Sequence, residues 1–153
     1  MSKYLTWLRS EIGHSPIINN GAAVIISNDR SEILLQKRYR DKDIWGIIGG
    51  SMDYGESLDE TAIREAREEI GCEIQIDYLI GVYSRFFVTC SNGDQLQAVT
   101  ALFGASVVGG QMRTDDVETF GLGYFSQKEL PEIDTHQLVF IEDYFSGKRG
   151  VWR

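Results

Sequence analysis

The sequence has few of the residues that build disulfide frameworks and histidine or thiolate metal sites. Its 153 residues include two cysteines, two histidines and two prolines. Cys72 and Cys90 form no metal-ligand cluster and no disulfide framework, which favours a reducing, cytoplasmic environment. No apolar run approaches the length of a membrane span, and the first residues lack the apolar core of a signal peptide. We therefore expect a soluble, cytoplasmic protein without a membrane partner.

Positive charge is also scarce. Lys and Arg number 15 against 23 Asp and Glu, so the formal net charge is -8. Because this field repels a phosphate backbone, we do not expect nonspecific nucleic-acid binding. A small phosphorylated ligand is compatible with the charge if a cation bridges it. The length and the 42% hydrophobic fraction fit a single globular domain over residues 1–153.

Hydrophobic periodicity predicts strands in the middle of the chain and helices near both ends. We expect a helix at 4–12, followed by a hairpin of strands 21–27 and 32–38. Strands 73–89 and 95–108 should be joined by the Asn92-Gly93 turn, and a last strand is expected at 117–125. A Ser126–Glu129 capping box should open a helical turn, and a closing helix is expected at 136–147. Strands on both sides of a central helix predict an α/β (α+β) fold, with a mixed sheet flanked by helices.

The central helix is the clearest element. Ser57 and Glu60 form a capping-box pattern at its start, and Gly71 stands where a C-terminal cap belongs. Apolar residues that recur at intervals of four predict its buried stripe: Leu58, Ala62, Ala66 and Ile70.

The same helix carries a cluster of carboxylates. Glu65, Glu68 and Glu69 are spaced i, i+3 and i+4, so their side chains project from one face. Each like-charge pair costs roughly 0.2–0.5 kcal/mol, which Arg64 relieves in part. A divalent cation such as Mg²⁺, which prefers oxygen ligands, would relieve more. Considered alone, such a triplet is more often a solvated acidic face.

The wider spacing resembles the signature of the Nudix (MutT-like) hydrolases, G-x5-E-x7-R-E-U-x-E-E-x-G-U. Gly50, Glu56 and the run 64–72 fill every fixed position, with Ala66 and Cys72 at the aliphatic ones. The fold that this resemblance implies is an α/β/α sandwich. In the WGIIGG segment before the signature, Ile48 replaces the family's usual proline, which should loosen the loop.

The resemblance implies water attack at phosphorus in a nucleoside diphosphate linked to another moiety, with Mg²⁺ as cofactor and Mn²⁺ as a substitute. The residues that it assigns as metal ligands are Glu65, Glu68, Glu69 and the Gly49 carbonyl. For the base it leaves Glu65, Glu68 and Glu118 as alternatives. Arg64 joins the catalytic group and pairs with Glu56, and the structural positions of the signature are Gly50, Glu56 and Gly71.

Substrate identity stays open among a nucleoside triphosphate, ADP-ribose and a nucleotide sugar. Arg38 and Arg40 are candidates for phosphate contacts and Phe86 for stacking on a base; the alternatives are a solvated strand end and a core position. A Nudix-fold module that senses a nucleotide without hydrolysing it is an alternative function. An RNA 5′-end hydrolase ranks low at this net charge. Dimers are frequent in the family, so a homodimer is an open expectation.

Overall fold

Helices and strands follow one another along the chain largely as the hydrophobic pattern predicts. The computed structural model describes residues 2–39, 42–90, 92–114 and 119–153. Its elements are α1 (Lys3–Ile12), β1 (Ile17–Ile26), β2 (Ile33–Lys37), β3 (Trp45–Gly46), β4 (Ile48–Ser51), α2 (Leu58–Ile70), β5 (Cys72–Thr89), β6 (Gln95–Gly110), β7 (Gly121–Phe125), a 3-10 turn (Gln127–Glu129), α3 (Leu138–Phe145) and β8 (Val151–Trp152). No helix in these ranges is long and apolar enough to cross a membrane.

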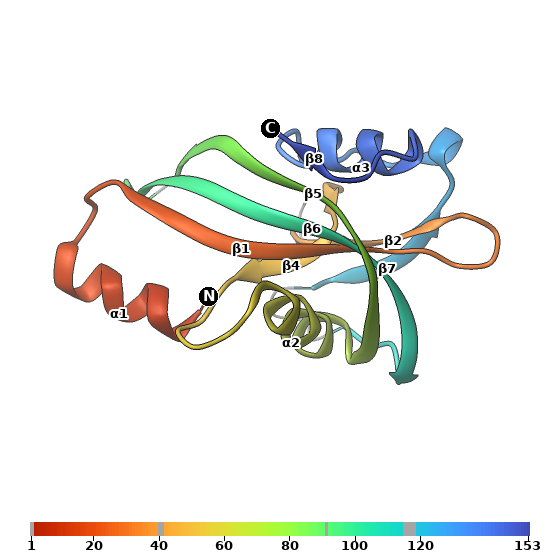
Figure 1. The fold of residues 1–153 in the computed structure, drawn as a ribbon, viewed down its shortest axis with the longest axis horizontal. Coiled ribbons are helices and arrows are strands. Elements are labelled where there is room, and N and C mark those ends of the chain that lie inside the picture. Colours follow the sequence, from red (N-terminus) through yellow and green to blue (C-terminus); the bar gives the residue numbers. More distant parts are fainter. Residues whose placement is uncertain (1, 40–41, 91, 115–118) are drawn as a thin grey trace.

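A mixed five-stranded sheet in the order β4-β1-β6-β5-β8 lies at the centre, with α2 on one side and α3 on the other (Figure 1). β1 runs parallel to β6, and β5 parallel to β8, while the remaining pairs are antiparallel. A second sheet has the order β3-β2-β7. This arrangement confirms the predicted sandwich of a mixed sheet between helices.

The continuous apolar run in β1 reflects burial of both faces of the strand. Ala22, Val24 and Ile26 pack in the core beneath α2, whereas Ala23 and Ile25 pack in the core beneath α3. Strands covered on both faces lose the usual alternation of polar and apolar residues. β1 therefore contributes side chains to both cores, and its pairing places the neighbouring strand β4 between them.

Local capping signals fix the ends of α2. The Ser57 hydroxyl accepts from the Glu60 backbone N–H while the Glu60 carboxylate accepts from the Ser57 N–H, which confirms the capping box. Gly71 adopts the left-handed conformation, with φ 70° and ψ 11°, and its N–H bonds to Arg67 O. The stripe at 62, 66 and 70 is fully buried, and Leu58 is partly buried. The predicted helix is thus correct at both ends.

The predicted hairpin of the first two strands extends no further than its turn. The Asn28 N–H donates to Glu32 O, and Ser27 forms a bridge with Ile33. Beyond this bridge β1 joins the five-stranded sheet and β2 the three-stranded one. Hydrophobicity marks both segments as buried strands, but it carries no information about which strand each one pairs with.

Two further expectations need correction at the C-terminal side. β7 was expected to be the last strand, but the short strand β8 follows α3 and pairs with β5. The expected turn after Ser126 forms as a 3-10 turn without the capping bond, because the Ser126 hydroxyl donates to the Glu129 carboxylate instead. Residues 117–118 of the predicted strand lie outside the described ranges.

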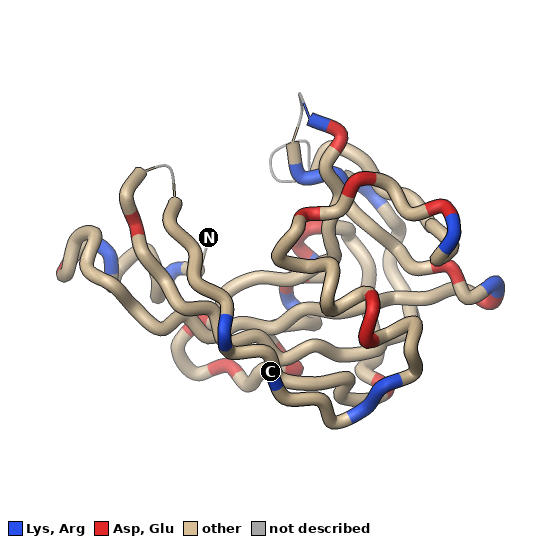
Figure 2. Tube along the Cα trace, turned by 90° about the horizontal axis from the view of Figure 1, so that it is seen from above, with Lys and Arg blue, Asp and Glu red and all other residues tan. Residues whose placement is uncertain are grey.

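Acidic and basic residues are interspersed over much of the described chain. Figure 2 shows Lys and Arg scattered among Asp and Glu along the described chain, not gathered into one track.

We expect Gly71→Ala to destabilise the protein more than Gly147→Ala. Both glycines have positive φ, +70° and +69°, which costs an alanine about 1–2 kcal/mol. At Gly71 a Cβ would also lie 2.8 Å from Arg113 Cγ and from Gln111 O, whereas within the described chain nothing lies within 4 Å of one at Gly147. Urea unfolding should show about 1 kcal/mol more loss for Gly71→Ala. Equal losses would mean that the segment around Arg113 moves aside at no cost.

Candidate active site

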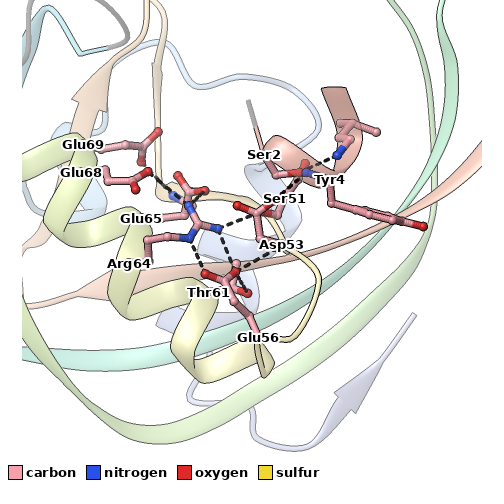
Figure 3. Close-up of polar contacts among 12 residues, drawn as sticks. Ser2, Tyr4, Ser51, Asp53, Glu56, Thr61, Arg64, Glu65, Glu68 and Glu69 are labelled. Atoms are coloured by element: carbon pink, nitrogen blue, oxygen red, sulfur yellow. Dashed lines mark hydrogen bonds and ion pairs between the residues drawn. The ribbon is translucent and has the colours of Figure 1, made fainter. Parts of the chain in front are cut away.

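Three glutamates of α2 face the segment that leads from β4 into the helix (Figure 3). Glu65 and Glu69 are 8% and 3% exposed, whereas the Glu68 side chain is 62% exposed. The helical spacing predicted a common face, and the structure shows that this face lies at the boundary between core and solvent. A fully solvated acidic face is therefore wrong for Glu65 and Glu69.

Glu69 is held on one of its two oxygens. Its Oε2 accepts from the Gly49 N–H at 3.0 Å and from Gln36 Nε2 at 2.8 Å. Arg38 Nη2 lies 3.8 Å from Oε1. Burial raises the pKa of Glu69 to about 7, against the opposing effects of Arg38 and the Gly49 hydrogen bond. A carboxylate this poorly neutralised favours an additional positive charge nearby.

Glu65 occupies the space that a side chain at Gly50 would need. A Cβ built on Gly50 would collide with the Glu65 carboxylate. Burial raises the pKa of Glu65, while the adjacent Arg64 opposes that rise. The glycine at position 50 therefore allows the backbone of β4 to approach a buried carboxylate closely.

Arg64 connects the glutamates with the loop. Its guanidinium donates to Glu56 Oε1 and Oε2 at 2.6 and 3.1 Å, to Glu65 Oε1 at 2.6 Å and to Glu68 Oε2 at 3.2 Å. Nη2 also donates to Ser51 O at 3.0 Å (Figure 3). The ion pair expected between Glu56 and Arg64 is present, and Arg64 neutralises two helix glutamates as well.

Glu56 closes the loop from the other side. Its Oε2 accepts from the Asp53 N–H at 2.9 Å and from the Thr61 hydroxyl at 3.0 Å. With Arg64 as the main cause, these contacts lower the pKa of Glu56 to about 2. The loop of residues 51–57 is therefore tied to the first turns of α2 by one ionised carboxylate.

Ile48 holds the start of this loop by packing. Its side chain is fully buried and its backbone pairs with Val24; that it leaves the loop looser than a proline would stays a prediction. Core contact and sheet pairing thus restrain the segment just before Gly49.

A cleft of about 390 Å³ opens beside the loop. Its lining includes Gly49, Gly50 and Arg38 together with the apolar side chains of Val88, Leu96 and Phe140. The cleft thus combines one basic side chain and glycine backbone with apolar side chains, as is usual for small-molecule sites.

The remaining candidates from the sequence fall in different places. Arg38 lines the cleft, whereas Arg40 and Glu118 lie outside the described residues. Phe86 packs edge-on against Phe140, with 5.5 Å between ring centroids, and is partly buried against the core beneath α3. It thus contacts a residue of the cleft wall, and stacking on a base stays a prediction.

Sequence reasoning missed Gln36 and Gln137. Gln36 is fully buried in β2 and bonds to Glu69. Gln137 lines the cleft, and its Oε1 accepts from the Ile47 N–H at 2.7 Å. The available signal for Gln36 was a polar residue inside the otherwise apolar run ILLQ; for Gln137 we find no comparable signal.

The donor set suits a hard divalent cation. Within the described chain no three acidic, histidine or cysteine side chains form a ready ligand cluster, since Arg64 binds two of the glutamates. The groups present are nevertheless all oxygen donors, and buried Glu69 has no cation closer than Arg38 at 3.8 Å among the described residues. Mg²⁺ takes carboxylates together with water and phosphate oxygens, so these residues fit it chemically.

Comparisons with known proteins agree on one family. The family model described as "NUDIX domain" matches residues 18–144. A Bacillus subtilis (strain 168) protein named "Putative 8-oxo-dGTP diphosphatase" is 40% identical over 132 residues, 86% of this chain and 83% of that protein. An "ADP-ribose pyrophosphatase" of Methanocaldococcus jannaschii is 26% identical over 127 residues, 82% of this chain and 72% of its own.

Solved structures give the same picture. The crystal structure of "MutT NUDIX hydrolase from Burkholderia pseudomallei" superposes with a TM-score of 0.70 at 26% identity, covering 84% of this chain and 98% of that one. Fold and sequence thus place this chain with the same group of proteins.

Glu56→Gln should destabilise the protein at neutral pH and much less in acid. The folded pKa of about 2 lies below the ordinary value of 4.5, so the ionised form stabilises the fold above about pH 4.5. That stabilisation, about 1–3 kcal/mol, is lost as the pH falls from about 4.5 to 2. Urea unfolding of both proteins across this range should show the difference shrink.

The control for this experiment is Glu73→Gln. Glu73 is 60% exposed, and its carboxylate lies 3.9 Å from Arg67. An exposed pair of this kind contributes about 0–1 kcal/mol. A difference between wild type and Glu56→Gln that stays constant with pH would contradict the ionised role of Glu56.

Proposed function

Because the chain belongs to the Nudix family and is a hydrolase of phosphoric anhydride bonds, we propose that it cleaves a nucleoside diphosphate linked to another moiety in a Mg²⁺-dependent reaction. The observation that carries this proposal is the pair of buried carboxylates, Glu65 and Glu69, set against Gly49 and Gly50, which line the cleft together with Arg38. A solvated acidic helix would have no reason to bury two glutamates beside a glycine-lined cleft.

The metal ligands in this proposal are Glu65, Glu68, Glu69 and the Gly49 carbonyl. Bound Mg²⁺ would offset the charge of the diphosphate and make water a stronger nucleophile at neutral pH. Mn²⁺, another hard divalent cation that accepts oxygen ligands, should replace it. The exposed Glu68 makes one contact with Arg64, at 3.2 Å, so it is the glutamate most free to change partner.

The protein's own groups position the substrate. Arg38, whose side chain lines the cleft and is 32% exposed, would bind a phosphate oxygen. Val88, Leu96 and Phe140 would receive the less polar part of the nucleotide. Arg64 stays on the protein side, holding Glu65 and the Ser51 carbonyl at the end of β4, the strand that carries Gly49 and Gly50.

A nucleoside triphosphate is the substrate class that we place first. The support is the 40% identity to the Bacillus subtilis relative, which is named a putative 8-oxo-dGTP diphosphatase. The archaeal relative at 26% identity is named for ADP-ribose, so that class belongs in the same test. Nucleotide sugars complete the set of diphosphate derivatives.

Phosphate and pyrophosphate release from a panel of these substrates should depend on Mg²⁺ and on Glu68. We expect one substrate to exceed the others, and Glu68→Gln to lower its turnover by about 100-fold or more, since loss of a ligand costs at least as much as loss of a supporting contact. Circular dichroism should show an intact fold. Near-wild-type turnover in a folded Glu68→Gln protein would exclude the metal-site assignment.

The base should be identifiable by comparing three substitutions: Glu65→Gln, Glu68→Gln and Glu118→Gln. Removal of a general base lowers kcat by about 10²–10⁴-fold, whereas removal of a ligand also weakens metal binding. We expect the base variant to lose more kcat than its loss of Mn²⁺ affinity accounts for, with the affinity measured by titration without substrate. If all three variants lose Mn²⁺ affinity in proportion to kcat, none of these glutamates acts as a separate base.

A further inference from the structure

Gln36 lies in the middle of β2, among apolar neighbours, and its side chain reaches the glutamate face of α2. The residue is fully buried. Its Nε2 donates to Glu69 Oε2 at 2.8 Å and to Ile47 O at 3.3 Å, and its Oε1 accepts from the Thr119 hydroxyl at 2.6 Å. A buried amide is costly unless its polar atoms are paired, and here both ends are paired.

These partners allow only one orientation of the amide. Turned by 180°, its oxygen would face the Glu69 carboxylate and the Ile47 carbonyl, which are both acceptors. The Thr119 hydroxyl supplies a donor on the opposite side. The Nε2 group is therefore fixed as a donor toward Glu69.

The two oxygens of Glu69 thereby acquire different surroundings. Oε2 is held by Gln36 and by the Gly49 N–H, which come from two different strands. Oε1 is the oxygen nearer to Arg38, a residue of the cleft wall, at 3.8 Å. Two donors on one oxygen restrict rotation of the carboxylate and leave the other oxygen as the one nearer to Arg38.

We propose that Gln36 is a positioning residue that orients the Glu69 carboxylate toward a divalent cation, and that Thr119 fixes the orientation of Gln36. The inference rests on the proposed metal-dependent function. Groups that hold a metal ligand in place typically change metal affinity or activity by 10–100-fold when removed. Gln36 bonds to a proposed ligand and is not among the residues that line the cleft, so its effect should appear first in metal affinity.

The test is Gln36→Leu, which keeps the approximate size and removes the hydrogen bonds. Mn²⁺ binding to the substrate-free protein, followed by electron paramagnetic resonance, should weaken about 10–100-fold. The Mg²⁺ concentration for half-maximal turnover should rise by a similar factor, and saturating Mg²⁺ should restore most of kcat. Rescue by metal is expected of a positioning role and not of general damage to the fold.

Ile33→Val serves as the matched control. Ile33 is fully buried in the same strand, and it packs in the core beneath α3. The variant should lower the melting temperature without changing Mn²⁺ affinity. Wild-type Mn²⁺ affinity in a folded Gln36→Leu protein would overturn the proposal.

Glu69→Gln distinguishes failure of this inference from failure of the proposed function. If Glu69→Gln weakens Mn²⁺ binding and Gln36→Leu does not, only the role of Gln36 is wrong. If neither substitution matters, the metal site itself is wrong. Should Gln36→Leu fail to fold, Thr119→Val removes the donor to Gln36 Oε1; it should weaken Mn²⁺ binding by up to about 10-fold, and wild-type affinity would overturn the proposal.

Discussion

The crowding of negative charge on α2, and its neutralisation by Arg64, is the constraint on which the site depends. One planar guanidinium bonds to Glu56 in the loop, to Glu65 and Glu68 on the helix, and to the Ser51 carbonyl at the end of β4. Only arginine offers several donors in fixed directions, so a lysine at this position would leave part of the cluster without a partner. The loop conformation is therefore a consequence of how charge is paired on the helix.

The three glutamates differ in burial, and each therefore has a different electrostatic environment. Glu69 is the deepest, at 3% exposed, and burial raises its pKa to about 7. Glu65 is nearly as deep, but Arg64 compensates it directly at 2.6 Å. Glu68 extends into solvent. Because a deep carboxylate gains more from an opposite charge than an exposed one, Glu69 has the most to gain from a cation, while Glu68 can adapt to what binds.

Local signals predicted the elements well and their partners poorly. The capping box at Ser57, the glycine at position 71 and the Asn92-Gly93 turn are readable because each acts within a few residues of itself. β1 and β2 belong to different sheets because each pairs with different strands, and the hydrophobic period of a segment does not encode its pairing partners. Gln36 shows the same limit: its polar character inside an apolar run was visible, but its partner Glu69 comes from a helix 33 residues later.

The division of the cleft explains why the sequence defined a reaction class without defining a substrate. Gly49 and Gly50, which line the cleft, belong to the signature segment or adjoin it, and they lie against the glutamates of α2. The apolar wall comes from β5, β6 and α3, through Val88, Leu96 and Phe140, which lie outside that segment. Relatives named for 8-oxo-dGTP and for ADP-ribose both align with this chain, so the reaction and the choice of nucleotide vary separately. Under the proposed function, substitutions along the apolar wall should therefore change which nucleotide is preferred and leave the metal requirement proposed for α2 unchanged.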